Sequence, residues 1–342
     1  MIALQASPTK QQIEQMVYQE YDFYPTHIEQ HGKVRKIECT RGIYALKQTA
    51  VNASQMTLLN CLFRYLRQQH YTSFLALEPS KYGDPFIDLE GSCYYVNRWV
   101  YDRTEEKYRE DWPQRVLRQL GHLHRLTLAY EEPAPVSPLT PEIIGRRWKN
   151  RLEKMQAYRQ LALGKPFMSP FEIAYVSHFE YLKELARQAM RYLQAWEEKL
   201  NKKQEQRAVI CHGNVHRQHV LHEDDRLYFI HFDHAVLDSP VRELALFYRR
   251  HLEPTAHWDV ETGFKWLEDY EEQFVLHGEE KLLLGIYLLF PERVFKEVEK
   301  YYEAKHHAHP FALARQFEQQ IELTRIIRRF VREIIQTDLK IT

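Results

Sequence analysis

The chain has 342 residues, which at roughly 150 residues per domain predicts two domains or one two-lobed domain. Its 47 Lys and Arg residues balance its 47 Asp and Glu residues, and this balance argues against a dedicated nucleic-acid binder. No apolar run approaches the roughly 18 residues that a membrane span needs. The N-terminus lacks a secretory signal pattern, and the four scattered cysteines are typical of reduced thiols in the cytosol.

The first hundred residues predict a small α+β domain. Ser7 and Thr9 precede a helical pattern of apolar residues. Two β-prone runs, residues 33–39 and 43–48, flank Thr40-Arg41-Gly42 and predict a hairpin. An amphipathic helix is predicted over 54–69, and two further strands over 74–77 and 93–99. We therefore assign residues 1–101 to a small N-terminal lobe with a helix and an antiparallel sheet.

The rest of the chain, residues 102–342, reads as a larger and mainly helical lobe. Apolar spacing marks a helix from Trp112, a long helix over 171–201 and a last helix that contains Phe317 and Ile334. A short strand over 208–211 and a hairpin over 220–232 interrupt the helices. Arg325, Arg328, Arg329 and Arg332 of the last helix are predicted to form a solvated face, and no function is assigned to His306, His307 and His309.

Segment 209–245 carries the most specific pattern in the chain. It runs as a strand, a His-Gly loop, a hairpin, and a helix that begins with proline. Its residues read His212-Gly213-Asn214-Val215-His216-Arg217-Gln218-His219, then His231-Phe232-Asp233, then Pro240-Val241-Arg242-Glu243-Leu244-Ala245. This layout resembles the catalytic segment of the aminoglycoside phosphotransferase and choline kinase group, where the pattern is H-G-D-x-H-x-x-N, D-F-[DE] and P-x-x-D-L-A.

The N-terminal half carries matching features. Gly42-Ile43-Tyr44-Ala45-Leu46-Lys47 resembles the strand with the phosphate-binding lysine, and Asn97-Arg98-Trp99-Val100 resembles the hinge. Residues 117–126, with an L-x-x-L-H ending, resemble the helix after the hinge. The resemblance implies an α+β, two-lobed, protein-kinase-like (aminoglycoside phosphotransferase-like) fold. Within the group the chain most resembles CotS-type spore coat proteins, in particular the YsxE branch.

Three positions that carry chemistry in this group are changed. Active members use an Asp to orient and deprotonate the hydroxyl nucleophile, and an Asn and a second Asp to hold Mg²⁺. Here these positions are Asn214, whose amide cannot accept a proton at a useful pH, and His219 and His231. Mg²⁺ prefers hard oxygen ligands, so imidazole is a poor replacement. These substitutions argue against ordinary kinase turnover.

The partner of the lysine and the phosphate loop are changed as well. The predicted helix after Lys47 holds no Asp or Glu to pair with it, and Gly42 is the single glycine between Lys33 and Lys47. Lys47 remains the candidate contact for a nucleotide phosphate, against the alternative of an ordinary strand lysine. His212 is expected to bond to the loop backbone. No cofactor is expected, although an active relative would bind ATP and Mg²⁺.

The histidines leave a metal site open as an alternative. His219 and His231 are expected to lie within a few ångströms of each other, and with Asp233 or His216 they would offer ligands that suit Zn²⁺, Ni²⁺ or Mn²⁺. The other interpretation is a set of hydrogen-bonded, neutral imidazoles, with Asp233 accepting bonds from nearby donors. The degenerate motif positions are therefore Asn214, His219, His231 and Asp233, and none is assigned as catalytic.

The expected function is non-catalytic. The resemblance implies a spore coat or coat-associated pseudokinase that acts through contacts with other coat proteins, made in the mother-cell cytoplasm during sporulation, with neither a nucleic acid partner nor a membrane span. The alternatives are an active small-molecule phosphotransferase of the aminoglycoside, choline or sugar type that uses altered groups, and a metal-dependent hydrolase built on the histidines.

Overall fold

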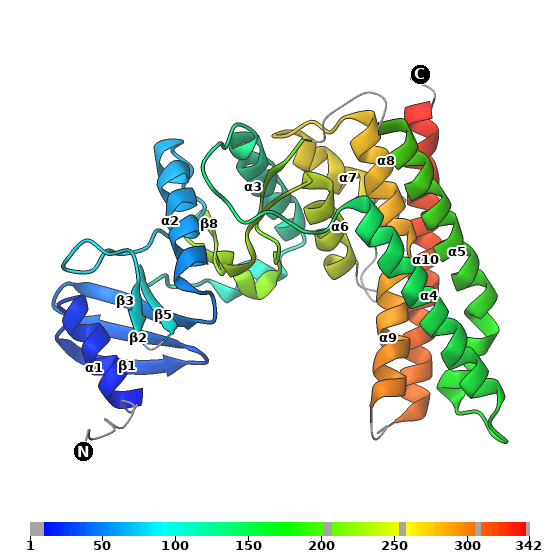
Figure 1. Ribbon diagram of the computed structural model, residues 1–342, viewed down its shortest axis with the longest axis horizontal. Helices are drawn as coiled ribbons and strands as arrows, with labels where there is room; N and C mark the ends of the chain where they lie inside the picture. Colours follow the sequence, from blue (N-terminus) through cyan, green and yellow to red (C-terminus); the bar gives the residue numbers. More distant parts are fainter. Residues whose placement is uncertain (1–9, 90, 201–206, 253–257, 305–308, 340–342) are drawn as a thin grey trace, which may run out of the picture. The chain divides into compact units, whose positions relative to one another are not determined.

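The computed structural model describes residues 10–89, 91–200, 207–252, 258–304 and 309–339 (Figure 1). The chain divides by its internal contacts into two compact units. Unit 1 comprises residues 1–112, 129–135 and 212–237, and unit 2 comprises 113–128, 136–211 and 238–342. The unit with the N-terminal sheet thus includes most of the motif segment. The lobe boundary predicted at residue 101 divides the chain into two continuous segments, whereas each of the two units is made of three segments. The boundary therefore stays a prediction.

Unit 1 is built on an antiparallel sheet of five strands in the order β1-β2-β3-β5-β4. The strands are β1 (Pro25–His31), β2 (Val34–Cys39), β3 (Gly42–Thr49), β4 (Ile87–Leu89) and β5 (Ser92–Arg98), and the helices of this part are α1 (Lys10–Glu20) and α2 (Ala53–Gln68). The predicted hairpin and the predicted helix over 54–69 are confirmed. Ser7 and Thr9 lie outside the described residues.

The two faces of the sheet have different neighbours. Leu46 and Val96 face one side and pack with Val17 of α1 and with Tyr21, which follows this helix. Because side chains alternate along a strand, Lys47 points to the other face, where it lies with α2 around one small cavity. Asn52 caps α2, since its Oδ1 accepts a hydrogen bond of 2.9 Å from the amide of Gln55.

The predicted strand over 74–77 is wrong. Residues 71–77 form an extended connector with isolated bridges, Phe74 to Phe229 and Glu78 to Val96. The side chain of Asn97 explains the difference, because its Nδ2 donates to the carbonyls of Leu75 (3.3 Å) and Ala76 (2.8 Å). A side-chain amide thereby takes acceptors that a ladder partner would have used.

The motif segment in unit 1 contains a hairpin of β7 (Val220–Glu223) and β8 (Arg226–Phe229), as predicted. Three short 3₁₀ turns belong to the same unit, Thr104–Tyr108, Arg217–His219 and Phe232–His234. Strand β9 (Val236–Asp238) follows. Buried Phe229 and Phe232 anchor the hairpin and the last of these turns, because each ring lies within 6 Å of the ring of His212.

Unit 2 is helical apart from β6 (Val209–Cys211). Its helices are α3 (Trp112–Thr127, whose first residue belongs to unit 1), α4 (Pro141–Leu163), α5 (Pro170–Leu200), α6 (Pro240–His251), α7 (Val260–Glu271), α8 (Gly278–Leu289), α9 (Glu292–Glu303) and α10 (Pro310–Leu339). The long helix α5 packs against both α4 and α10 (Figure 1). The predicted helices beginning near 112, 171 and 240 and the last helix are confirmed, while α4 was not predicted.

Stacked aromatic rings fix the helices of unit 2 against one another. Trp148 of α4 stacks on Phe290 with ring centroids 4.4 Å apart, and Phe171 of α5 stacks on Tyr301 of α9 at 4.2 Å. The arginines of α10 named above lie mainly on its exposed side, whereas Phe317 and Ile334 are buried. His306 and His307 lie outside the described residues.

Candidate functional site

Lys47 lies in the middle of β3 with 7% of its surface exposed. The side chains that α2 directs to the same cavity are Met56, Leu59 and Phe63, and the helix carries no carboxylate. No ion pair joins Lys47 to any residue in the part of the chain that the structure describes. Burial lowers the pKa of Lys47 to about 8, and the charge of Asp233 opposes this shift. The lysine is thus a buried cation. As the sequence predicts, α2 offers it no acidic partner.

Asp233 lies in the 3₁₀ turn Phe232–His234 and lines the same cavity as Lys47. Its Oδ2 accepts a hydrogen bond of 3.3 Å from the hydroxyl of Thr49, two residues after Lys47. Lys47 and Asp233 therefore lie close together, as a kinase-like fold requires. The cavity has a volume of about 20 Å³, which is close to the space of a single water molecule.

His212 has the structural role that the sequence predicts. The ring is fully buried, and its Nε2 lies 2.8 Å from the carbonyl oxygen of Ile230. Its Nδ1 accepts a hydrogen bond of 3.3 Å from the amide of Asn214, so Nε2 carries the proton. His212 therefore links the loop to the end of the hairpin through two backbone groups.

Gly213 is required at its position by backbone geometry. Its φ of +76° lies in the left-handed region, and a Cβ placed there would come within 2.4 Å of the carbonyl oxygen of His234. A residue with a side chain would have to displace backbone rather than a flexible group. The His-Gly turn is thus held by sterics independently of any chemistry in the loop.

Three imidazoles lie next to one another beside this turn. The ring centroids of His216 and His219 are 3.7 Å apart, and those of His219 and His231 are 4.6 Å apart, as expected from the motif. The Nδ1 of His219 lies 2.9 Å from the carbonyl oxygen of Asn214. His231 adopts a left-handed φ of +63°, which is uncommon for a residue other than glycine.

Burial and mutual repulsion keep the central imidazoles neutral. Burial lowers the pKa of His219 to about 3, with the charges of His216 and His231 adding to the effect. Burial together with the charge of Lys47 lowers the pKa of His231 to about 4. At neutral pH these rings therefore add no charge beside Lys47, and they accept or donate hydrogen bonds as neutral groups.

The histidines of the motif do not form a group of three metal ligands in the described part of the chain. Among the described residues, ligand atoms of three such side chains lie within 4.8 Å of one another at His124, Cys211 and Glu243 instead. Structural zinc sites use four protein ligands and catalytic ones three. His219 and His231 alone would thus leave most of the coordination to other ligands.

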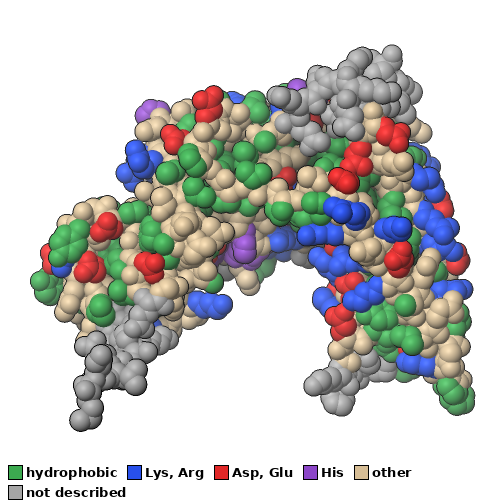
Figure 2. Space-filling model, in the orientation of Figure 1, with side chains coloured by type: hydrophobic (Ala, Val, Ile, Leu, Met, Phe, Trp, Pro, Cys, Tyr) green, Lys and Arg blue, Asp and Glu red, His purple; other side chains and the backbone are tan. Residues whose placement is uncertain are grey.

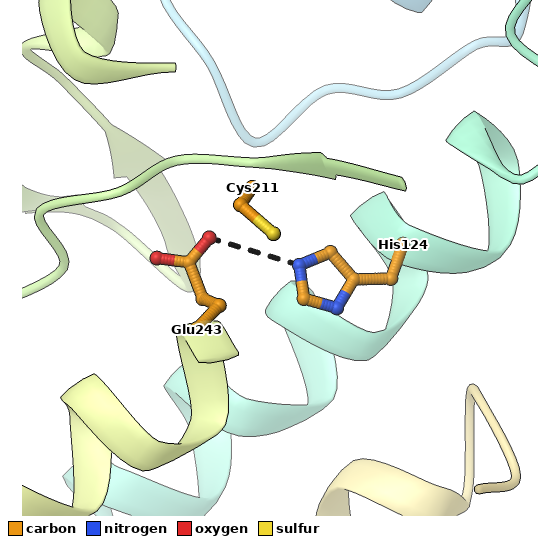
Figure 3. A group of neighbouring side chains, drawn as sticks. All are labelled: His124, Cys211 and Glu243. Atoms are coloured by element: carbon orange, nitrogen blue, oxygen red, sulfur yellow. Dashed lines mark ion pairs between the residues drawn. The ribbon is translucent and has the colours of Figure 1, made fainter. Parts of the chain in front are cut away.

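His124, Cys211 and Glu243 all belong to unit 2 and are almost completely buried (Figure 3). The Nε2 of His124 lies 3.7 Å from a carboxylate oxygen of Glu243, and its Nδ1 lies 2.7 Å from the hydroxyl of Tyr270. The group joins α3, β6, α6 and α7. One signal in the sequence points to this group, the histidine that ends the apolar pattern L-x-x-L-H.

The chemistry of this group favours a structural link over a metal site. A metal would require the thiolate of Cys211, but burial, with Glu243 and Asp238 nearby, raises the pKa of this thiol well above its usual range. The sulfur also lies 3.5 Å from the carbonyl oxygen of Ser239, as a donor. The imidazole is oriented by Tyr270 and faces a carboxylate, an arrangement that ties helices together in a buried core.

None of the helices that the structure describes is both long and apolar enough to cross a lipid bilayer.

The chain is similar to known proteins in sequence and in fold. A curated relative, the "Endospore coat-associated protein YutH" of Bacillus subtilis, is 29% identical over 256 residues, which are 73% of this chain and 70% of the relative. Among solved structures, an aminoglycoside phosphotransferase from Alicyclobacillus acidocaldarius has a TM-score of 0.81 at 16% identity and covers 99% of both chains. The amicoumacin kinase hAmiN has a TM-score of 0.62 at 14% identity, with 94% of this chain and 96% of that chain covered.

The predicted fold, α+β and aminoglycoside phosphotransferase-like, is confirmed by these structures, and the predicted relation to kinase-like spore coat proteins is confirmed by the sequence comparisons. The assignment to the YsxE branch stays a prediction. The model of the family described as "Spore coat putative kinase YutH" matches residues 14–334, nearly the whole chain. The chain therefore belongs to the YutH family of spore coat putative kinases.

Proposed function

We propose that this protein is a catalytically inactive member of its family that works in the spore coat through contacts with other coat proteins. The main observation in support of this proposal is the joint replacement of groups that phosphoryl transfer needs. Asn214 stands at the position of the base, and neutral His219 and His231 stand at the positions of the Mg²⁺ ligands. Transfer depends almost entirely on positioning and on charge stabilisation by these groups.

Lys47 supports the same proposal. In active enzymes of kinase-like fold this lysine contacts phosphates while an acid on the neighbouring helix holds it. Here the lysine faces Met56, Leu59 and Phe63 beside a cavity of about 20 Å³. A lysine held in this way is not presented to a triphosphate. The coat context rests on the family and on the curated relative, which is described as associated with the endospore coat.

A second candidate function is phosphoryl transfer by altered groups. It is favoured by the proximity of Lys47, at the position of the phosphate-binding lysine, and Asp233, a carboxylate two residues after the position of the metal-binding Asp. Solved structures with the same fold are named as phosphotransferases and kinases. In this case Asp233 would carry the metal alone, without a second carboxylate or amide from the motif.

Thermal unfolding with and without millimolar ATP·Mg²⁺ separates the two functions. A ligand at 100 times its Kd stabilises the folded state by about 2.7 kcal/mol, which corresponds to a rise in melting temperature of a few degrees. We expect no saturable rise. A rise that disappears in Lys47→Met, together with ³²P transfer to a hydroxyl compound that disappears in Asn214→Ala, would establish the second function.

The coat function is tested in sporulating Bacillus cells. We expect a fluorescent fusion of the protein to locate to the coat of the spore, and the fusion with Asn214→Ala and Asp233→Asn to locate there equally well. Diffuse fluorescence of the unmodified fusion at all stages of sporulation would contradict a place in the coat. Loss of location in the double variant alone would show that the motif itself is needed.

A further inference from the structure

Unit 2 contains a pocket of about 540 Å³ whose lining includes Arg242 and Ala245 from the last part of the motif segment but no residue of its His-Gly loop or hairpin. Its walls come from α4, from α6, from Tyr287 near the end of α8, and from α9. A volume of this size falls in the range of sites for small molecules. The pocket lies wholly within one compact unit, so its lining is fixed by the packing of these helices.

The lining is strongly cationic. Its Lys and Arg residues number six and its acidic residues two, which gives 6 − 2 = +4. The cations are Arg147, Arg151, Lys154, Arg242, Arg249 and Lys296, and the acids are Glu292 and Glu299. Asp238 and Glu303, which pair with Arg242 and Lys154, reduce the local excess to +2. The whole chain is neutral, so the excess is a local feature, and Figure 2 shows Lys and Arg side chains gathered over α4 and α9.

Two of these arginines, Arg147 and Arg249, keep hydrogen-bond donors available for a ligand. Arg151 is held by Glu292 and Glu299, but no residue in the described ranges forms an ion pair with Arg147. Arg249 donates to the carbonyl of Tyr287, and its buried Nε has no hydrogen-bond partner in the structure. Burial lowers the pKa of Arg249, with Glu292 opposing the shift. A buried guanidinium with an unused donor is costly unless an acceptor satisfies it.

One wall of the pocket is apolar. Trp148, Ile144 and Leu246 line it, and Trp148 is held in place by its stacking on Phe290. Sites for small molecules combine such apolar walls with a few polar groups that fix orientation. Here the polar groups are guanidinium and ammonium donors, and guanidinium forms paired hydrogen bonds with carboxylate and phosphate oxygens.

We propose that this pocket binds a small organic anion through Arg147, Arg249 and Lys296. The ligand carries at least two phosphate or carboxylate charges, and its uncharged part lies against Trp148. The site needs neither nucleotide nor Mg²⁺, so it goes beyond the proposed function and holds whichever of the two functions is correct. Such a site lets the protein respond to a metabolite independently of phosphoryl transfer.

The test is isothermal titration calorimetry of the full chain in 150 mM NaCl with two probes, inorganic pyrophosphate and citrate. The salt restricts electrostatic effects to about 8 Å, so distant charges have little influence. We expect saturable binding of at least one probe, and which of the two binds more tightly identifies phosphate or carboxylate as the preferred group. The polycation spermidine, as the opposite-charge control, should not bind at this site.

Two double variants with the same change of charge locate the site. Arg147→Gln with Lys296→Gln removes two lining cations, while Arg146→Gln with Lys149→Gln removes two exposed cations of α4 that do not line the pocket. We expect the first to weaken binding at least tenfold and the second less than twofold, with unchanged circular dichroism in both. Equal losses in the two variants, or no binding of either probe by the unmodified protein at 10 mM, would overturn the proposal.

Discussion

Lys47 in unit 1 and His124 in unit 2 are both buried titratable groups, but their surroundings differ. His124 is fully buried between a tyrosine hydroxyl and a carboxylate. Lys47 is nearly as buried and faces apolar side chains, with Asp233 acting on it only through its charge. The polar group of unit 2 links helices within a buried core, whereas the polar group of unit 1 is a buried cation to which the neighbouring helix α2 offers no acid. Stability measurements can distinguish these two situations.

The largest expected effect is the loss of His124. His124→Ala removes the partner of the buried Tyr270 hydroxyl and opens a cavity beside the buried carboxylate of Glu243, so we expect a loss of about 3 kcal/mol or more in the free energy of unfolding. His219→Ala, in the partly exposed imidazole group, should cost less than about 1 kcal/mol. Urea unfolding monitored by circular dichroism measures both. Similar losses in the two variants would remove the contrast between the units.

Lys47→Met should act in the opposite direction. Because the folded-state pKa of Lys47 is about 8, below the usual value of about 10.4, the unfolded chain binds more protons between these pH values. The penalty is fully present below pH 8 and fades as the pH rises toward 10.4. We expect Lys47→Met to stabilise the protein by about 1–3 kcal/mol at pH 7, and by less at pH 10. Destabilisation at pH 7 would show that Lys47 has a partner that holds it.

The smallest expected effect concerns acid. The pKa values of His219 and His231 in the fold are about 3 and about 4, below the ordinary value of about 6.5. The unfolded chain therefore binds more protons in this window, and stability falls as the pH drops from 6.5 toward 4. His219→Asn with His231→Asn should make the decline shallower, measured by urea unfolding at pH 7, 6 and 5. The exposed pair His27→Asn with His31→Asn is the control, and an equal flattening there would refute the assignment.

Much of the fold follows from sequence pattern because long periodic segments and turn residues act locally. The amphipathic pattern of α2 and the Thr-Arg-Gly turn before β3 are such signals. Strand β1 carries no such signal in its sequence, because all of its residues except the first are exposed. It is held in the sheet by backbone pairing with β2. Helix α4 was missed because its buried positions are few along 23 residues and prolines precede it.

The candidate sites were predictable to different degrees for the same reason. The proximity of Lys47 and Asp233 could be predicted because motif spacing encodes a known three-dimensional arrangement. The cationic pocket could not be predicted, because Arg147, Arg249 and Lys296 come from three different helices. About a hundred residues separate the first from the second along the chain, and more than forty separate the second from the third. No local pattern signals that such side chains will meet; packing of the helical unit brings them together.

The backbone at Gly213 has a consequence for how such proteins are found and how they diverge. A turn that tolerates no Cβ beside the carbonyl of His234 is needed for folding whether or not the loop carries out chemistry. The backbone therefore constrains the His-Gly pair, while it sets no such steric limit on the acids of the motif. A comparison that begins from the catalytic acids would pass over chains of this kind, whereas one that begins from the turn and the hairpin would detect chains with and without those acids alike.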